Sequence, residues 1–147
     1  MFAATSALVG SEDSCRRCHA LAPSSAPTAP IDERDLARVA VHALCEDGPA
    51  GADYVLTGPD SLTRFEQISI IGRVIGGTLR IEEISPDEAR QELLSIMPAG
   101  VVNMSLNAWA AAIGQHAFVT STVADIPGVP ARPCADWVAD HSAEFRA

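Results

Sequence analysis

Hydrophobic residues recur every three or four positions in several stretches of the chain, which is the spacing of a helix with one buried face. The first such stretch begins at Asp32, whose carboxylate can cap a helix, and is stopped by Gly48 and Pro49. A second begins at the capping-box pair Thr63 and Glu66 and ends at Gly76-Gly77. Each of these patterns predicts one amphipathic helix.

Two shorter stretches have the alternation or β-propensity of strands. Residues 54–57 form a β-prone run that is closed by the turn residues Gly58-Pro59-Asp60. Around residues 79–82, Leu79 and Ile81 alternate with charged residues, which predicts a half-buried strand.

Three further helices are expected in the second half of the chain. One starts at Ser85, which is followed by Pro86 and by a return carboxylate at Glu88. The next follows Pro98, ends at Gly114, and repeats apolar residues on one face, namely Val102, Leu106, Trp109 and Ile113. The last covers residues 135–145 and turns three residues toward the core, namely Trp137, Val138 and His141. The pattern as a whole predicts an α/β fold with two or three strands and about five helices.

Residues 1–30 differ from the rest of the chain, because small residues and prolines dominate. Neither the helical spacing of three to four residues nor the alternation of a strand is sustained there. We expect a flexible N-terminal arm at 1–30 and a single domain at 31–147.

Composition excludes several classes of function. The net charge is −9, which repels phosphate backbones, so neither nucleic acid nor an anionic membrane is an expected partner. All ten basic residues are arginines, which excludes a Schiff-base lysine and a phosphate-binding Gly-Lys-Ser/Thr loop. The apolar runs are too short to span a bilayer, and we expect a cytoplasmic protein with reduced cysteines.

Several segments together resemble the NmrA-like, atypical short-chain dehydrogenase/reductase family. They are Pro-Ile-Asp-Glu-Arg-Asp-Leu-Ala at 30–37, Tyr-Val-Leu-Thr-Gly-Pro-Asp-Ser-Leu-Thr at 54–63, Ile71-Gly72, Glu-Ile-Ser-Pro-Asp-Glu at 83–88 and Trp-Val-Ala-Asp-His at 137–141. The resemblance runs from about Ala26 to the end and implies the C-terminal part of a Rossmann-type fold, with the last sheet strands and a small helical substrate domain. It also implies NAD(P) as the coenzyme of such proteins, which act as reductases of small organic substrates or as nucleotide-responsive regulators.

The glycine-rich turn that holds a dinucleotide in that family has no counterpart in this sequence. We therefore expect that the chain binds no cofactor by itself and is inactive alone, as a truncated relative of NAD(P)-dependent reductases. One alternative is an NAD(P)H-linked oxidoreductase that acts as a homodimer or with a partner chain supplying the nucleotide-binding half. A second alternative is a regulatory or zinc-binding module.

Candidate substrate-binding residues lie on the helix after Pro98. Asn103, Asn107 and Trp109 belong to that helix, and His116 follows its end. If the helix lines a substrate pocket, as the resemblance implies, these side chains can orient a small polar molecule beside apolar walls. A core helix with two amides facing solvent is the competing interpretation. No residue is assigned a catalytic role.

Two further groups of residues have a chemical and a structural interpretation. Cys15, Cys18 and His19 have the spacing of a c-type haem attachment, and Cys15 and Cys18 can also join His42 and Cys45 as zinc ligands. Unligated thiols are the favoured interpretation, and no metal site is assigned. The carboxylates of Asp32, Glu33 and Asp35 crowd one helix start, where capping and dipole compensation are favoured over acid/base chemistry.

Overall fold

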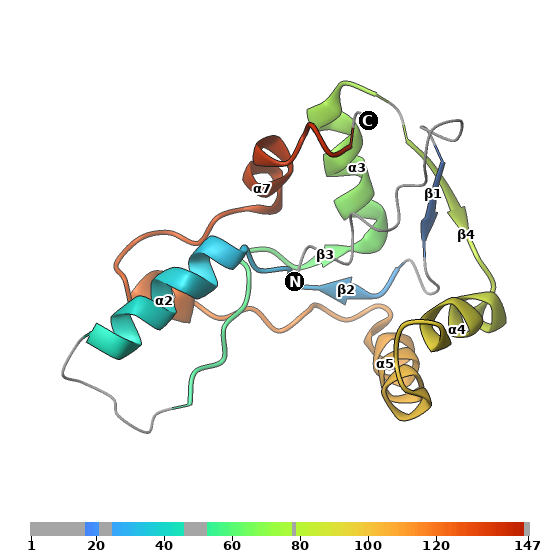
Figure 1. Ribbon diagram of the computed structural model, residues 1–147, viewed down its shortest axis with the longest axis horizontal. Helices are drawn as coiled ribbons and strands as arrows, with labels where there is room; N and C mark the ends of the chain where they lie inside the picture. Colours follow the sequence, from blue (N-terminus) through green and yellow to red (C-terminus); the bar gives the residue numbers. More distant parts are fainter. Residues whose placement is uncertain (1–16, 21–24, 46–52, 78, 146–147) are drawn as a thin grey trace.

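The computed structural model describes residues 17–20, 25–45, 53–77 and 79–145 and has an α/β fold, as predicted (Figure 1). Six helices and four short strands occur in this part of the chain. In order they are β1 (Arg17–Ala20), β2 (Pro27–Thr28), α2 (Glu33–Cys45), β3 (Leu62–Thr63), α3 (Arg64–Ile75), β4 (Arg80–Glu83), α4 (Pro86–Leu94), α5 (Ala99–Ala112), α6 (Thr122–Asp125) and α7 (Cys134–Asp140).

The strands form two separate two-stranded sheets. β1 and β4 are parallel, with Arg17 opposite Arg80, and β2 and β3 are antiparallel, with Pro27 opposite Thr63. β1 and β2 both fall within residues 1–30, where the sequence showed no period. Strands of four and two residues are too short to produce a recognisable alternation. The flexible-arm assignment and the domain boundary at residue 30 stay predictions.

Both predicted capping boxes are present. The Thr63 hydroxyl accepts a hydrogen bond from the Glu66 N–H, and the Glu66 carboxylate accepts one from the Thr63 N–H. Ser85 and Glu88 repeat this reciprocal arrangement at the start of α4. Gly76 ends α3 with a left-handed φ of 75°, which favours glycine. These two helices therefore begin where their local sequence directs them to begin.

Residues 54–57 were predicted to form a strand, and this prediction is wrong. The segment is extended, but it has no ladder partner in the described part of the chain. Hydroxyl groups make its contacts instead: Thr57 Oγ1 accepts from the Thr120 N–H at 2.9 Å, and Thr120 Oγ1 donates to the Val55 carbonyl at 3.0 Å. The turn after the segment is held by the Gly58 N–H, which donates to the Ala29 carbonyl.

The predicted helix after Asp32 is confirmed as α2, but its apolar stripe is only partly buried. Val39 is buried, whereas Leu36 is 39% and Leu44 is 86% exposed. The expected stop of α2 at Gly48-Pro49 lies outside the described residues. The predicted strand around residues 79–82 is confirmed as β4, whose side chains are not described.

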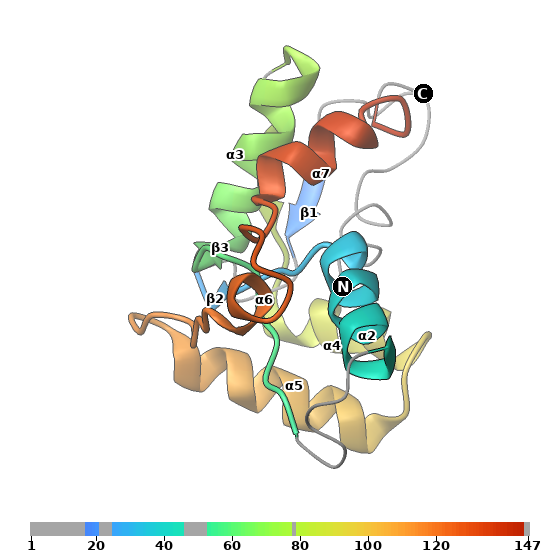
Figure 2. The same cartoon turned by 90° about the vertical axis from the view of Figure 1, so that its left-hand side faces the viewer.

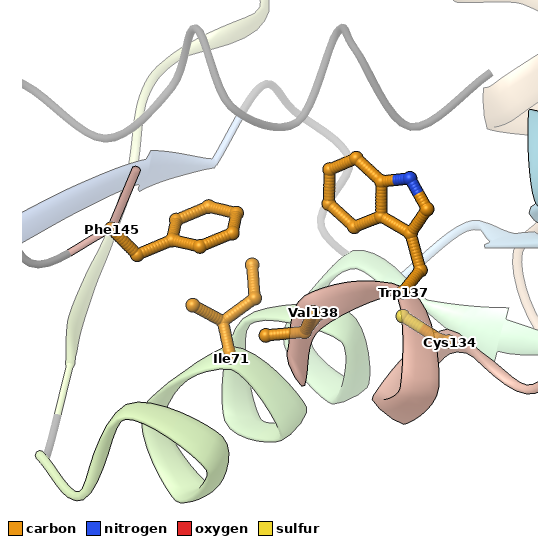
Figure 3. Packing of buried hydrophobic residues seen from close by; sticks show 5 residues of the cluster. All are labelled: Ile71, Cys134, Trp137, Val138 and Phe145. Atoms are coloured by element: carbon orange, nitrogen blue, oxygen red, sulfur yellow. The ribbon is translucent and has the colours of Figure 1, made fainter. Parts of the chain in front are cut away.

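The main hydrophobic core lies between α3 and α7 (Figure 3). Ile71 of α3 packs against side chains from α7 and the turn after it: Cys134, Trp137, Val138 and Phe145. α7 ends at Asp140, earlier than the predicted 145, yet Phe145 still reaches the core and is 3% exposed. His141 is only half-buried. Among the described helices, none has the length and hydrophobicity that a bilayer crossing requires.

Candidate functional site

Helix α5 carries three of the four candidate substrate-binding residues, and it places them on different faces. Its inward face consists of buried or half-buried side chains at helical spacing: Val102, Ser105, Leu106, Trp109 and Ala112. Asn103 and Asn107 lie on the exposed side of the helix, and His116 is exposed beyond its end. Trp109 is thus separated from the two amides. Their role in binding a substrate stays a prediction.

Trp109 has a cationic neighbour that the sequence did not reveal. The guanidinium of Arg64, the first residue of α3, lies 6.0 Å from the centroid of the indole ring. This is the outer range of a cation–π contact. Arg64 is half-buried, and burial lowers the pKa of its guanidinium below the ordinary value. The guanidinium of Arg64, which has lost part of its hydration, therefore lies beside α5.

The connection that follows α5 is fixed to the segment that precedes α3. The Ala117 N–H donates to Ser61 Oγ at 2.9 Å, and the Thr120 N–H donates to Thr57 Oγ1 at the same distance. These two hydrogen bonds bracket Phe118, which is 72% exposed. Figures 1 and 2 show α5 below the small β2–β3 pair, with this connection running back toward α2 and α6. The contact with Ser61 therefore fixes the backbone directly after His116.

A second polar cluster joins α2 to the segment before α7. Asp32 and Asp35 are buried, and both accept hydrogen bonds from Arg132: its Nε reaches Asp32 Oδ2 at 2.6 Å, and its N–H reaches Asp35 Oδ2 at 2.7 Å. The hydrogen bond to Asp32 raises the pKa of the Arg132 guanidinium. Asp140 binds both Arg132, at 2.6 Å, and Arg34. We call these five residues the α2–α7 clamp.

Capping is confirmed for Asp32, whose Oδ1 accepts from the Arg34 N–H at 2.8 Å. Glu33, next to it, has a different role. Its Oε2 accepts from the Trp137 indole N–H at 2.8 Å, and its Oε1 lies 3.8 Å from His141 Nε2. The rings of Trp137 and His141 stack with centroids 4.2 Å apart. The acidic cluster therefore holds the helix start and also docks the C-terminal helix.

The Cys/His hypotheses fall largely outside the described residues. The side chains of Cys15, Cys18 and His19 are not described, so neither the haem nor the zinc arrangement is tested. His42 and Cys45 do lie on one helix, α2, and Cys45 is an exposed free thiol. Over the described ranges, no three His, Cys, Asp or Glu side chains come together as metal ligands would.

Large apolar side chains are exposed on and around α5. Met104 on the helix is 66% exposed, and Ile96 in the turn before it is 74% exposed. Ile113, which was expected on the inward face, lies directly after the helix and is 48% exposed. Val101 and Val119 are also exposed. Exposed apolar side chains of this size are often covered by a ligand or by another protein segment.

The curated proteins that resemble this chain include reductases. No family model matches it. It is 41% identical over 121 residues to a (4-alkanoyl-5-oxo-2,5-dihydrofuran-3-yl)methyl phosphate reductase of Streptomyces griseus, covering 82% of this chain and 43% of that protein. It is 33% identical over 119 residues to an NAD(P)H azoreductase of Xenophilus azovorans, covering 80% of this chain and 42% of that protein. The chain thus spans less than half the length of these curated relatives.

The fold agrees with the sequence comparison. An NADPH-dependent quinone oxidoreductase of Escherichia coli superposes with a TM-score of 0.70 at 20% identity, over 96% of this chain and 50% of that one. This likeness confirms the Rossmann-type fold class. The chain matches the C-terminal portion of NAD(P)-binding reductases of the NmrA-like, atypical short-chain dehydrogenase/reductase type.

Proposed function

We propose that this polypeptide is the substrate-side portion of an NAD(P)H-dependent reductase of small organic molecules. The observation that carries this proposal is the 41% identity to a reductase across 82% of the chain. The exposed apolar side chains of α5, with Trp109 and Arg64 on its inner side, support a role in contacting a substrate or the coenzyme-binding portion.

The coenzyme site is proposed to come from a nucleotide-binding portion that carries a glycine-rich turn. Pyrophosphate binding requires backbone N–H groups at a helix N-terminus that the phosphate can approach closely, and glycines make this approach possible. A second copy of this sequence would add no such turn, so a homodimer alone does not complete the site. A covalently linked or separate nucleotide-binding portion does. The proposed compartment is the cytoplasm, where an exposed thiol such as Cys45 stays reduced.

The test has two arms. In the first, the 147-residue chain is titrated with NADPH by calorimetry, and no binding is expected. In the second, the chain is added, or fused, to the nucleotide-binding portion of the Streptomyces griseus reductase, and NADPH oxidation is followed with a quinone, an azo dye and a phosphate ester as acceptors.

We expect acceptor-dependent NADPH oxidation only when both portions are present, and the nucleotide-binding portion alone is the matched control. Micromolar NADPH binding by the 147-residue chain would overturn the proposal that another portion supplies the coenzyme site. A combined protein that binds NADPH but reduces none of the acceptors faster than the control would count against the reductase assignment.

A further inference from the structure

Arg64 differs from the other half-buried arginines, Arg38 and Arg132, in having no acidic partner among the described residues. Arg34 and Arg132 bind Asp140, Arg132 also binds Asp32, and Arg38 pairs with Asp35 at 3.1 Å. Within the described ranges, no carboxylate lies at ion-pair distance from the Arg64 guanidinium, although acidic residues outnumber basic ones by nineteen to ten. Among the half-buried arginines that the structure describes, Arg64 is therefore the one without a carboxylate partner.

The acid nearest to Arg64 in sequence is already engaged. Glu66 uses its carboxylate to accept hydrogen bonds from the Thr63 N–H at 2.7 Å and the Thr63 hydroxyl at 2.8 Å. Positions 64 and 66 are about 200° apart around a helix, so the two side chains leave α3 on opposite sides. The capping box therefore holds Glu66 away from the guanidinium and leaves its positive charge available.

The contact with Trp109 orients the guanidinium without neutralising it. A cation–π contact at a partly exposed site is weak, whereas a guanidinium that has lost part of its hydration gains more from a planar oxyanion that accepts two parallel hydrogen bonds. The first turn of α3 already contains the Glu66 carboxylate, so the preference for an anion rests on the Arg64 charge itself.

We infer that Arg64, held in place by Trp109, binds an oxyanion of the substrate, a phosphate or carboxylate group on a small organic molecule. Arg64 is the binding residue and Trp109 is a positioning residue. This inference rests on the proposed function, because it names the class of substrate that the proposed reductase portion receives. It also separates the role of Trp109 from that of Asn103 and Asn107, which lie on the other side of α5.

The experiment uses the full 147-residue chain and phenyl phosphate as the probe. The indole N–H signals of Trp109 and Trp137 are followed by NMR during the titration, and a Trp109→Phe variant assigns the two signals. We expect saturable movement of the Trp109 signal, with that of the buried Trp137 unchanged. Arg64→Gln should weaken binding by about tenfold or more, because a hydrogen-bonded charge is lost. Arg90→Gln, which removes an exposed arginine of α4, is the matched control and should bind like the wild type.

A second variant keeps the inference falsifiable if Arg64→Gln does not fold. Arg64→Lys retains the charge but loses the planar guanidinium, which can donate two parallel hydrogen bonds to an oxyanion. Several-fold weaker binding is therefore expected. Absence of any Trp109 shift in the wild type, or undiminished binding by Arg64→Lys, would overturn the inference. Adenosine 2′,5′-bisphosphate is titrated in parallel, and tighter Arg64-dependent binding of this nucleotide would assign the oxyanion to the coenzyme instead. Because the readout is binding by the chain itself, it is independent of the NADPH titration and of acceptor reduction.

Discussion

The side chain of Arg132 donates a hydrogen bond from Nε to Asp32 Oδ2 at 2.6 Å, across 100 residues of sequence. Asp32 is 1% exposed, so its carboxylate has exchanged water for this guanidinium and for the Arg34 N–H. A buried carboxylate is tolerated only when such partners are present. The contact joins the first described helix to the segment that leads into the last one.

Replacement of Asp32 tests this relationship. Asp32→Ala removes the cap of α2 and leaves Arg132 without its main partner, so we expect the free energy of unfolding to fall by about 2 kcal/mol. Urea denaturation followed by circular dichroism measures the change. Asp53→Ala, at an exposed carboxylate, is the control and should change stability by less than about 0.5 kcal/mol. Equal effects of the two substitutions would contradict the importance of the clamp.

Gly58 is predicted to tolerate no side chain. A Cβ at this position would lie 1.8 Å from the Pro30 carbonyl oxygen and 2.7 Å from its carbon. Because both atoms belong to the backbone, Gly58→Ala should force the chain apart and cost about 2–4 kcal/mol. Gly100→Ala is the matched control: nothing lies within 4 Å of the added methyl, and its place in α5 predicts a gain of about 0.5–1 kcal/mol. Thermal unfolding of both variants provides the comparison.

Two cysteines should react at very different rates. Cys134 is the first residue of α7, where a helix N-terminus favours a thiolate, but burial opposes it and, with the nearby charge of Asp60, raises the pKa of the thiol to about 11. Cys45 is exposed. At neutral pH we expect maleimide to label Cys45 readily, and Cys134 only after denaturant is added. Peptide mass spectrometry distinguishes the sites, and rapid labelling of Cys134 in the native protein would show that the α3–α7 core opens easily.

The capping box of α3 makes a pH-dependent contribution to stability. Hydrogen bonds from the Thr63 backbone and then from its hydroxyl lower the pKa of Glu66 below its ordinary value of 4.5. A carboxylate whose pKa is lower in the folded state stabilises the fold above the unfolded pKa and loses that contribution as the pH falls through the folded pKa. Wild-type melting temperature should therefore drop below about pH 4.5 more steeply than that of Glu66→Gln.

Glu92→Gln is the control for this pH profile, because Glu92 is exposed in the last turn of α4 and belongs to no capping box. The effect of Glu66 is expected to be small, since the carboxylate is well exposed to solvent. Parallel melting-temperature profiles for the wild type and Glu66→Gln between pH 3 and 6 would argue against a contribution from the capping box.

The helix caps and the helix stop depend only on neighbours within four residues, so they could be predicted from the sequence. The pairs Thr63–Glu66 and Ser85–Glu88 and the stop at Gly76 are confirmed, because each motif satisfies its own backbone groups locally. The prediction of a strand at 54–57 is wrong, because strand formation requires a partner that local propensity does not reveal.

The polar contacts of the candidate site could not be predicted in the same way. Arg64 and Trp109 come from different helices 45 positions apart in sequence, and no spacing rule relates them. Helical periodicity did place Trp109 on the inward face with Val102, and the same periodicity puts Asn103 and Asn107 on the solvent side. Asp32 and Glu33 were recognised as helix-start residues, but their partners Arg132 and Trp137 lie a hundred residues later.

The distance along the chain between Asp32 and Arg132 also sets an order of events during synthesis. At about 5–20 residues per second, the ribosome adds Arg132 roughly 5–20 s after it adds Asp32. Throughout that interval the carboxylate must remain hydrated, so the beginning of α2 cannot adopt its final packing. The burial of Asp32, and with it the final packing of α2, therefore has to wait until Arg132 has been translated.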